Sequence, residues 1–304
     1  MGEPSTGTLV LVGTPIGNRG DLSPRARAAI LAADLLLCED TRSPTRLLGD
    51  SEPLPRRVSC FVGNEHERVA MLLERLAAGE RVAFVSEAGM PVWSDPGAML
   101  VRAAADAGFA VEVIPGPSAG TMGLALSGFS ASWSQFVGFV DRSGGGRAAS
   151  LRRVVEATGP SILFEAGNRV AGLLRDLSRA APDAATRQVM VGRELTKLHE
   201  EVYRGSLEEL AEVLAGGVRG EVTVVIDGAP SSLREAAEID QRAGAREVLG
   251  LMTDLSLKPK ARAKAIASRT GLSIRDVYAR LSAQRSPSPL ELEERHDEDQ
   301  DVDD

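Results

Sequence analysis

The sequence is poor in cysteine, histidine and long apolar runs, and each shortage argues against a class of protein. Two cysteines among 304 residues are too few for a disulfide framework and indicate a reducing compartment. The three histidines are scattered, so no Cys/His cluster has the spacing of a metal site. No apolar run approaches the roughly 18 residues that cross a membrane, and the first residues lack the pattern of a signal peptide. We therefore expect a cytoplasmic protein with no metal ion and no membrane partner.

Glycine-rich phosphate-binding signatures are missing as well. Neither GxxxxGK[ST] nor a GxGxxG after a strand occurs, which argues against a nucleoside triphosphate or a dinucleotide. Instead, the apolar strands Val82–Val85 and Val111–Ile114 run into SEAGMPVWSDPG and PGPSA. Parallel strands that end side by side leave a crevice at their carboxyl ends, where open α/β sheets bind ligands. Such loops suit a ligand with amino, carboxylate and ribose groups, although a single loop of this kind is often an ordinary turn.

Charge is distributed unevenly along the chain. The formal net charge of -8 arises at the C-terminal end, where residues 290–304 hold nine acidic residues against Arg295. Just before them, residues 257–286 carry eight basic residues against Asp276 alone. A basic block of this kind indicates a polyanionic partner, and a solvated helical face is the alternative.

Strands and helices alternate along most of the chain. The alternation predicts right-handed β-α-β crossovers and a mostly parallel sheet. The spacing of strands and helices changes near Ala119, which predicts two α/β domains, residues 8–118 and 119–228, with a ligand cleft between them. Residues 243–285 are predicted to form a helical module with a helix-turn-helix pattern that could bind RNA, and residues 287–304 an acidic disordered tail.

Local signals predict individual elements. Ser23 before Pro24 has the pattern of a helix N-cap, and Ser206 with Glu209 has the spacing of a capping box. The chain is also expected to form a strand at 58–62 and a helix at 67–78. Three consecutive glycines, residues 144–146, predict a mobile loop that acts as a lid or a linker.

Seven segments of the chain, in the order in which the family has them, resemble the ribosomal RNA small subunit methyltransferase I family of the tetrapyrrole methylase superfamily. The resemblance extends from about residue 8 to residue 285. The segments are LVLVGTPIGNRGDLSPRA (9–26), ADLLLCEDTRSPTRLL (33–48), VAFVSEAGMPVWSDPG (82–97), VIPGPSA (113–119), FVGFVDR (136–142), GRELTKLHEEVYRG (192–205) and RGEVTVVIDG (219–228).

This resemblance implies a fold, an activity and partners. The fold is α/β, with two domains of the tetrapyrrole methylase type, a cleft between them and a small C-terminal helical module. The activity is transfer of a methyl group from S-adenosylmethionine (SAM) to a cytidine 2′-hydroxyl in the decoding centre of 16S ribosomal RNA in the small ribosomal subunit. The resemblance implies a homodimer and no DNA partner. Because the same fold also methylates tetrapyrroles and peptides, a small-molecule or peptide methyltransferase is the alternative.

The resemblance also implies site residues. A ribose hydroxyl is a poor nucleophile, so a base or a cation should help remove its proton. The residues considered for this role are Asp21, Glu39, Asp40, Glu87, Asp95 and Lys197, and no single base is identified. Glu39, Asp40, Arg42 and Lys197 are the candidate catalytic residues, the first three on the acceptor side. The expected SAM-binding residues are Pro15, Ser86, Glu87, Ala88, Gly89, Met90, Asp95, Pro117, Ser118, Ala119, Phe164, Glu165, Met190, Gly192 and Arg193.

The sequence departs from the family pattern at two places. The loop that usually contains SDAGTP has SEAGMP here, so Glu87 and Met90 replace an aspartate and a threonine. The usual ESPHR is EAGNR, at residues 165–169. We expect Glu87 and Asp95 to order the SAM loop, and we expect SAM binding to tolerate both departures.

Overall fold

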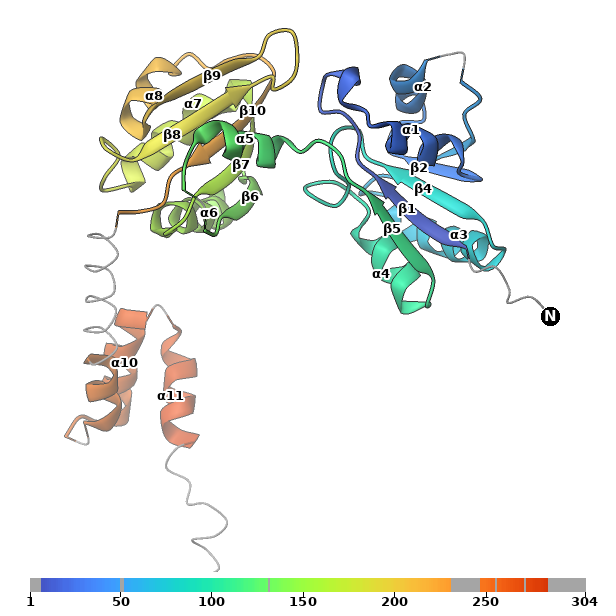
Figure 1. The fold of residues 1–304 in the computed structure, drawn as a ribbon. Helices are drawn as coiled ribbons and strands as arrows, with labels where there is room; N and C mark the ends of the chain where they lie inside the picture. The colour runs from blue at the N-terminus through green and yellow to red at the C-terminus, as the bar shows by residue number, and fades with distance from the viewer. Residues whose placement is uncertain are drawn as a thin grey trace, which may run out of the picture. The chain divides into compact units, whose positions relative to one another are not determined.

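The structure is a computed structural model of the chain. It describes residues 7–49, 52–130, 132–230, 247–254, 256–270 and 272–283. The chain divides into two compact units, Met1–Ala229 and Pro230–Asp304. The first unit contains two β-sheets, and the described part of the second is helical (Figure 1).

The first sheet is parallel throughout and has the strand order β3-β2-β4-β1-β5. Each strand follows a helix or a turn, as the alternating pattern predicts. The strands are β1 (Thr8–Val12), β2 (Leu35–Cys38), β3 (Arg56–Ser59), β4 (Arg81–Val85) and β5 (Ala110–Ile114). The helices of this part are α1 (Pro24–Leu31), α2 (Ser43–Leu48), α3 (Glu65–Ala77) and α4 (Ala98–Asp106), with the 3-10 turn η1 (Arg19–Asp21) before α1.

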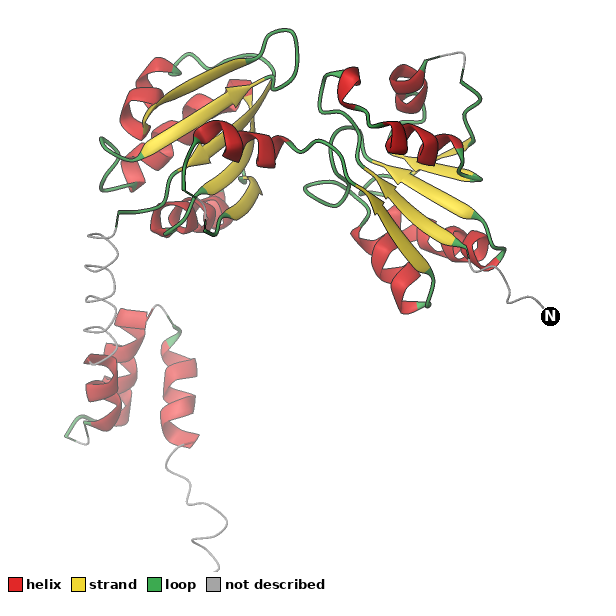
Figure 2. Ribbon diagram, in the orientation of Figure 1, coloured by secondary structure: helices red, strands yellow, loops and turns green. Residues whose placement is uncertain are grey.

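Helices cover both faces of this sheet (Figure 2). Side chains alternate along a strand, so Leu9 and Leu11 pack with α3 and α4 on one face. Val10 and Val12 pack with α1 on the other face. A parallel sheet covered on both sides requires strands that are apolar along their whole length, which is why β1 and β4 are continuous apolar runs.

The second sheet is mixed, with the order β6-β7-β10-β8-β9. Only β6 and β7 are parallel, and the other three pairs are antiparallel. The strands are β6 (Gln135–Phe139), β7 (Ser161–Ala166), β8 (Gln188–Arg193), β9 (Glu201–Ser206) and β10 (Glu221–Ile226). The prediction of a mostly parallel sheet is therefore wrong here. The short loop between β8 and β9 leaves no room for a crossover helix, so the two strands form a hairpin.

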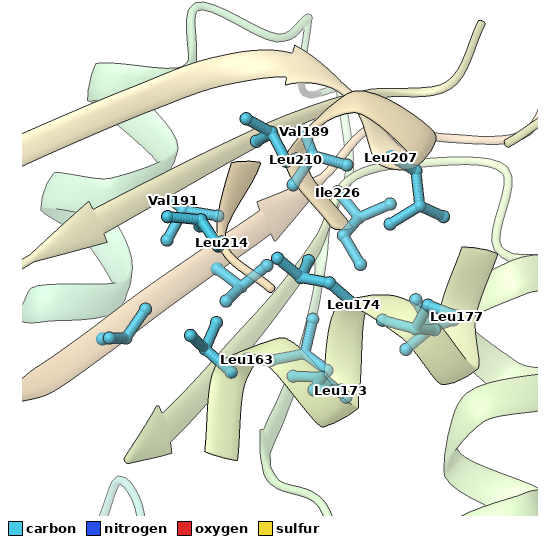
Figure 3. Close-up of a cluster of buried hydrophobic side chains, with 14 of the residues drawn as sticks. Leu163, Leu173, Leu174, Leu177, Val189, Val191, Leu207, Leu210, Leu214 and Ile226 are labelled. Carbon is cyan, nitrogen blue, oxygen red and sulfur yellow. The ribbon is translucent and has the colours of Figure 1, made fainter. Parts of the chain in front are cut away.

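One helix lies on one face of the second sheet and three lie on the other. The helices are α5 (Ala119–Ser127), α6 (Gly144–Glu156), α7 (Gly167–Ala180) and α8 (Leu207–Val213). Leucines of α7 and α8 fill the core beneath β7, β8 and β10 (Figure 3). On the opposite face, α5 packs on β10 so closely that a Cβ on Gly123 would lie 2.6 Å from Thr223 Cγ2.

Two predicted caps are present, and three predicted boundaries are corrected. The Ser23 hydroxyl accepts the Ala26 amide at 3.0 Å, and Ser206 and Glu209 form the capping box. The predicted strand 58–62 is β3 at 56–59, because the Asn64 side chain accepts the Phe61 amide and turns the chain. Helix α3 accordingly begins at residue 65 rather than 67.

The glycine run 144–146 is not a mobile loop, because it forms the first turn of α6. Gly144 has φ 82°, a left-handed backbone that glycine adopts readily, so glycine is tolerated there. Arg147 then fastens the turn through the Asp176 carboxylate at 2.6 Å and the Asp141 carbonyl at 3.0 Å.

The second unit contains α10 (Pro259–Thr270) and α11 (Ile274–Ala283), preceded by helical residues 247–253. Ala263, Ile266, Val277 and Leu281 form the contact between α10 and α11. The predicted acidic tail at 287–304 lies outside the described residues. Within the described ranges, no helix has the length and apolar character needed to span a membrane.

Candidate active site

The loops that follow β1, β4 and β5 are joined at the carboxyl edge of the first sheet. Thr14 and Gly89 exchange backbone hydrogen bonds of 2.8 and 3.1 Å. The Gly116 amide lies 3.2 Å from Met90 Sδ. A Cβ at Gly13 would lie 2.6 Å from the Gly116 nitrogen. These loops approach so closely that glycine is required at the contact.

A cavity of about 390 Å³ opens between these loops and the carboxyl end of β7 with its neighbours in the second sheet. Its volume lies in the range of small-molecule sites. The wall is mainly apolar, with a few carboxylates and one lysine. It is formed by Ile16, Ala88, Gly89, Met90, Trp93, Ser94, Asp95, Ser118, Ala119, Phe139, Phe164, Glu165, Ala166, Gly192, Leu195, Lys197, Gly220, Glu221, Val222 and Thr223.

Aromatic side chains form one side of this wall. The rings of Trp93 and Phe136 lie 4.3 Å apart, centroid to centroid. Phe164 meets Phe136 edge-on at 5.1 Å and Phe139 at 5.8 Å. Trp93 comes from the loop after β4 and the phenylalanines from β6 and β7, so this cluster joins the two halves of the first unit.

Two loops of the site hold residues in the left-handed backbone region. Val92 (φ 79°) and Ser94 (φ 68°) lie in the loop after β4, and Glu194 (φ 51°) and Thr196 (φ 68°) lie in the loop after β8. Among the described residues these are the only non-glycine residues with positive φ. Such strain persists where the surrounding structure enforces it, and it concentrates at functional sites.

The carboxylates after β2 bind the loop after β4 rather than the cavity. Glu87 accepts the Asp40 amide at 3.0 Å and the Ser43 hydroxyl at 2.8 Å. Glu39 accepts the Glu87 amide at 3.0 Å. Asp40 in turn holds Arg42 at 2.8 Å, and that arginine side chain is 80% exposed. This group forms a hydrogen-bonded rim with an exposed, ion-paired arginine at its outer edge.

The acids of the site differ in basicity. Hydrogen bonds from Arg42 hold the pKa of Asp40 well below its usual range. Burial raises the pKa of Glu39. Burial and, next, the charge of Glu39 raise the pKa of Asp95 to about 6. The Asp95 carboxylate therefore titrates closer to neutral pH than an ordinary aspartate does.

Lys197 remains a cation. Burial alone would lower its pKa, but its Nζ donates to Glu221 at 2.7 Å and Glu194 at 3.0 Å, and these contacts together raise the pKa above the ordinary value. The loop after β1 lies directly against it, since a Cβ on Gly17 would lie 2.4 Å from Lys197 Cγ. Lys197 is therefore suited to electrostatic stabilisation rather than to accepting a proton.

The structure brings ten of the sequence-predicted site residues into the cavity wall. They are Ala88, Gly89, Met90, Asp95, Ser118, Ala119, Phe164, Glu165, Gly192 and Lys197. Nine others lie outside it, namely Pro15, Glu39, Asp40, Arg42, Ser86, Glu87, Pro117, Met190 and Arg193. Met190 is fully buried under α5 with Ile162 and Val225. Arg193 turns to the Glu201 carboxylate at 3.1 Å.

Some wall residues are absent from the sequence-based set. Trp93, Leu195 and Glu221 are examples. Trp93 stands inside the SEAGMPVWSDPG loop and is one of two tryptophans in the chain, which is a usable signal. Leu195 and Glu221 face the cavity because of loop turns after β8 and before β10, and no sequence pattern marks them.

Comparisons with known proteins agree with this architecture. The family model of the tetrapyrrole (corrin/porphyrin) methylases matches residues 8–211. The ribosomal RNA small subunit methyltransferase I of Mycobacterium tuberculosis is 45% identical over 227 residues, 74% of this chain and 79% of its own length. The protein of the same name from Thermotoga maritima is 39% identical over 73% of this chain and 99% of its own length.

A solved structure shares the fold. The cobalt precorrin-4 methyltransferase of cobalamin biosynthesis superposes with a TM-score of 0.55 at 17% identity, covering 72% of this chain and 94% of its own. At this identity the likeness concerns the fold alone.

Proposed function

The chain belongs to the tetrapyrrole methylases and is a SAM-dependent methyltransferase, and from this premise we propose that it methylates a cytidine 2′-hydroxyl in the decoding centre of 16S ribosomal RNA. The main support is its 45% identity to a protein named for methylation of small-subunit ribosomal RNA. The cavity at the edge of the first sheet is the proposed catalytic site. The cell compartment proposed is the cytoplasm, where the ribosomal subunits lie.

The cavity residues fit SAM. The Glu165 side chain is 1% exposed, and one of its oxygens receives the Ala166 amide at 2.9 Å. Its other oxygen is buried at the wall without a hydrogen-bond partner. A buried acceptor of this kind is costly unless a donor reaches it. The ammonium, the adenine amino group and the ribose hydroxyls of SAM are such donors, so we propose Glu165 as one of its contacts.

The chain's own residues then position the reactants. SAM supplies a methyl group on a sulfonium centre that is already activated for transfer. Trp93, Phe139 and Phe164 exclude water from the cavity, which strengthens electrostatic interactions inside it. The hydrogen-bonded loops of β1, β4 and β5 hold the donor still, and positioning supplies much of the rate of a displacement. The rim of Glu39, Asp40 and Arg42 shapes the acceptor side.

The helical module of the second unit is proposed as an RNA-binding surface. Lys258, Lys260, Lys264, Arg275 and Arg280 are exposed on it. Phosphate contacts of this kind provide affinity without sequence information.

A homodimer is also proposed. Phe61, Val62 and Met99 are 46%, 75% and 47% exposed. Phe61 and Val62 lie between β3 and α3, and Glu65 at the start of α3 accepts the Met99 amide at 2.9 Å. Contiguous exposed apolar side chains mark interaction sites, and light scattering of the purified protein tests the assembly.

The decisive experiment is transfer of labelled methyl from SAM to small ribosomal subunits that lack their own 2′-O-methylation, followed by mapping of the label. We expect label on a decoding-centre cytidine ribose. Label on no RNA, with SAM still bound, would contradict the proposed acceptor, and tetrapyrroles and peptides would then be the substrates to test. A protein that binds RNA but not SAM would contradict catalysis altogether.

A further inference from the structure

We propose that Asp95 is the general base of the transfer, and this rests on the proposed ribose acceptor. As the acceptor oxygen forms its bond to the methyl carbon, the carbon–sulfur bond of the donor breaks and its electron pair leaves with sulfur. The hydroxyl proton passes to the Asp95 carboxylate. No further reactant is needed, because the deprotonated carboxylate is regenerated by loss of that proton to water.

The other carboxylates of the site are already engaged. Glu39 accepts a backbone amide and Glu87 accepts a hydroxyl and an amide, so both serve to join loops. Asp40 holds Arg42. None of these three lies in the cavity wall.

The remaining carboxylates of the wall are also less available. Glu221 pairs with Lys197, which Glu194, a residue outside the wall, also holds. Glu165 lies 3.3 Å from Arg169 through one oxygen, and its other oxygen is the proposed acceptor for a donor of SAM. Asp95, by contrast, lines the cavity, and the Ser86 hydroxyl beside it lowers its pKa. Among the described residues, Asp95 is the wall carboxylate that no ion pair engages.

The backbone holds Asp95 in place. The Val92 amide donates to the Pro96 carbonyl at 3.1 Å and closes a tight loop around it. The next residue, Gly97, donates its amide to the buried Glu65 carboxylate at 2.9 Å. Ser94 on the other side has a left-handed backbone. A catalytic group needs support of this kind to hold its geometry.

The surroundings also suit its task. Burial and the charges of Glu39 and Glu87 raise the pKa of Asp95 to about 6, although the Ser86 hydroxyl lowers it in part. Lys197 and Glu165 share the same cavity wall. A base whose pKa lies near the working pH is more effective than an ordinary carboxylate and is still mostly ionised at neutral pH.

The test compares Asp95→Asn, Asp95→Glu and Asp176→Asn with the wild type, using labelled methyl transfer to unmethylated small subunits and calorimetric SAM binding. Asp176 pairs with Arg147 away from the cavity, so Asp176→Asn is a matched carboxylate-to-amide control. For Asp95→Asn we expect kcat to fall about 10²- to 10⁴-fold, with SAM affinity within threefold of wild type. Asp95→Glu should recover part of kcat. In the wild type, kcat should fall as the pH drops below about 6, and this acidic limb of the pH–rate profile should be absent in Asp95→Asn.

Three results would overturn the proposal. The first is a kcat of Asp95→Asn within threefold of the wild-type value. The second is a loss of activity that is explained entirely by weaker SAM binding, which would make Asp95 a SAM ligand. The acidic limb could also persist in Asp95→Asn. In each case the wild type still labels the subunits, so the proposed function stands. A wild type that labels no RNA counts against both.

Discussion

Asp95 carries a charge into a half-buried cavity wall, and its effect on stability should follow from the direction of its pKa shift. The folded state raises that pKa from 3.8 to about 6, so the folded state binds the proton more tightly than the unfolded state does. A group with a raised folded pKa stabilises the fold only while protonated. Its contribution is therefore complete below about pH 4, declines between pH 4 and 6, and is absent above.

Asp95→Asn should consequently stabilise the protein relative to wild type at pH 8 and not at pH 4. One pKa unit corresponds to about 1.4 kcal/mol, and solvent screening of a partly exposed group reduces this energy. We therefore expect the free energy of unfolding at pH 8 to rise by about 1 kcal/mol. Chemical denaturation at the two pH values measures it. Equal stabilities at pH 8, or a gain at pH 4 as well, would contradict the pKa shift. A more stable yet slower variant is the pattern expected of a functional residue.

The sequence locates single residues better than it orients them. It places Glu87 after β4, because an apolar run ends there, and this position is correct. It does not reveal that the Glu87 carboxylate turns to Ser43 and the Asp40 amide, since the length of a side chain and the position of a neighbouring loop decide that together. For the same reason Arg193 was expected at the cofactor but reaches Glu201.

At the scale of elements, the loop after β4 stores strain that a substitution can release. Val92 is β-branched, has φ 79° and is 43% exposed. A left-handed β-branched residue costs of order 1–3 kcal/mol, whereas glycine adopts this backbone freely and costs roughly 0.5–1 kcal/mol in entropy.

Val92→Gly should therefore raise the melting temperature by about 2–4 °C, because a net gain near 1 kcal/mol has that effect in a unit of this size. Val213→Gly is the control, since Val213 is exposed in α8 and glycine in a helix costs about 0.5 kcal/mol. Thermal unfolding should move in opposite directions for the two variants. A fall for both would show that Val92 is unstrained.

We also expect Val92→Gly to weaken SAM binding, because the loop around Asp95 loses its fixed turn.

Elements are predictable where one periodicity dominates. Strands β1, β2 and β4 of the first sheet are mainly apolar, and Ser23 and Ser206 mark helix starts, so both kinds of element were predicted. Strand β9 was not, because its sequence EVYRGS alternates weakly and its pairing with β8 depends on a hairpin. The glycines at 144–146 predicted a loop from composition, but tertiary contacts of Arg147 make them helical.

At the scale of the whole molecule, the chain consists of two compact units. The family match, residues 8–211, falls within the first unit. The Thermotoga maritima relative is matched over 99% of its length by 73% of this chain, so about a quarter of this chain has no counterpart there. The two-domain α/β fold followed from the sequence, while the mixed second sheet did not. The second unit lies outside the family match, and its exposed basic residues call for a function of their own.

If that function is RNA binding, its salt dependence should show it. Lys260 and Lys264 lie one turn apart on α10 and are exposed, so replacing both with glutamine should remove about two phosphate contacts. The slope of log K against log salt for small-subunit RNA should then become shallower by about 1.5 to 2, while SAM affinity stays at the wild-type value. The matched control is Arg175→Gln with Arg179→Gln, an exposed pair one turn apart on α7 of the first unit. An unchanged slope for the α10 pair, or an equal change for the α7 pair, would show that the second unit does not bind the RNA backbone.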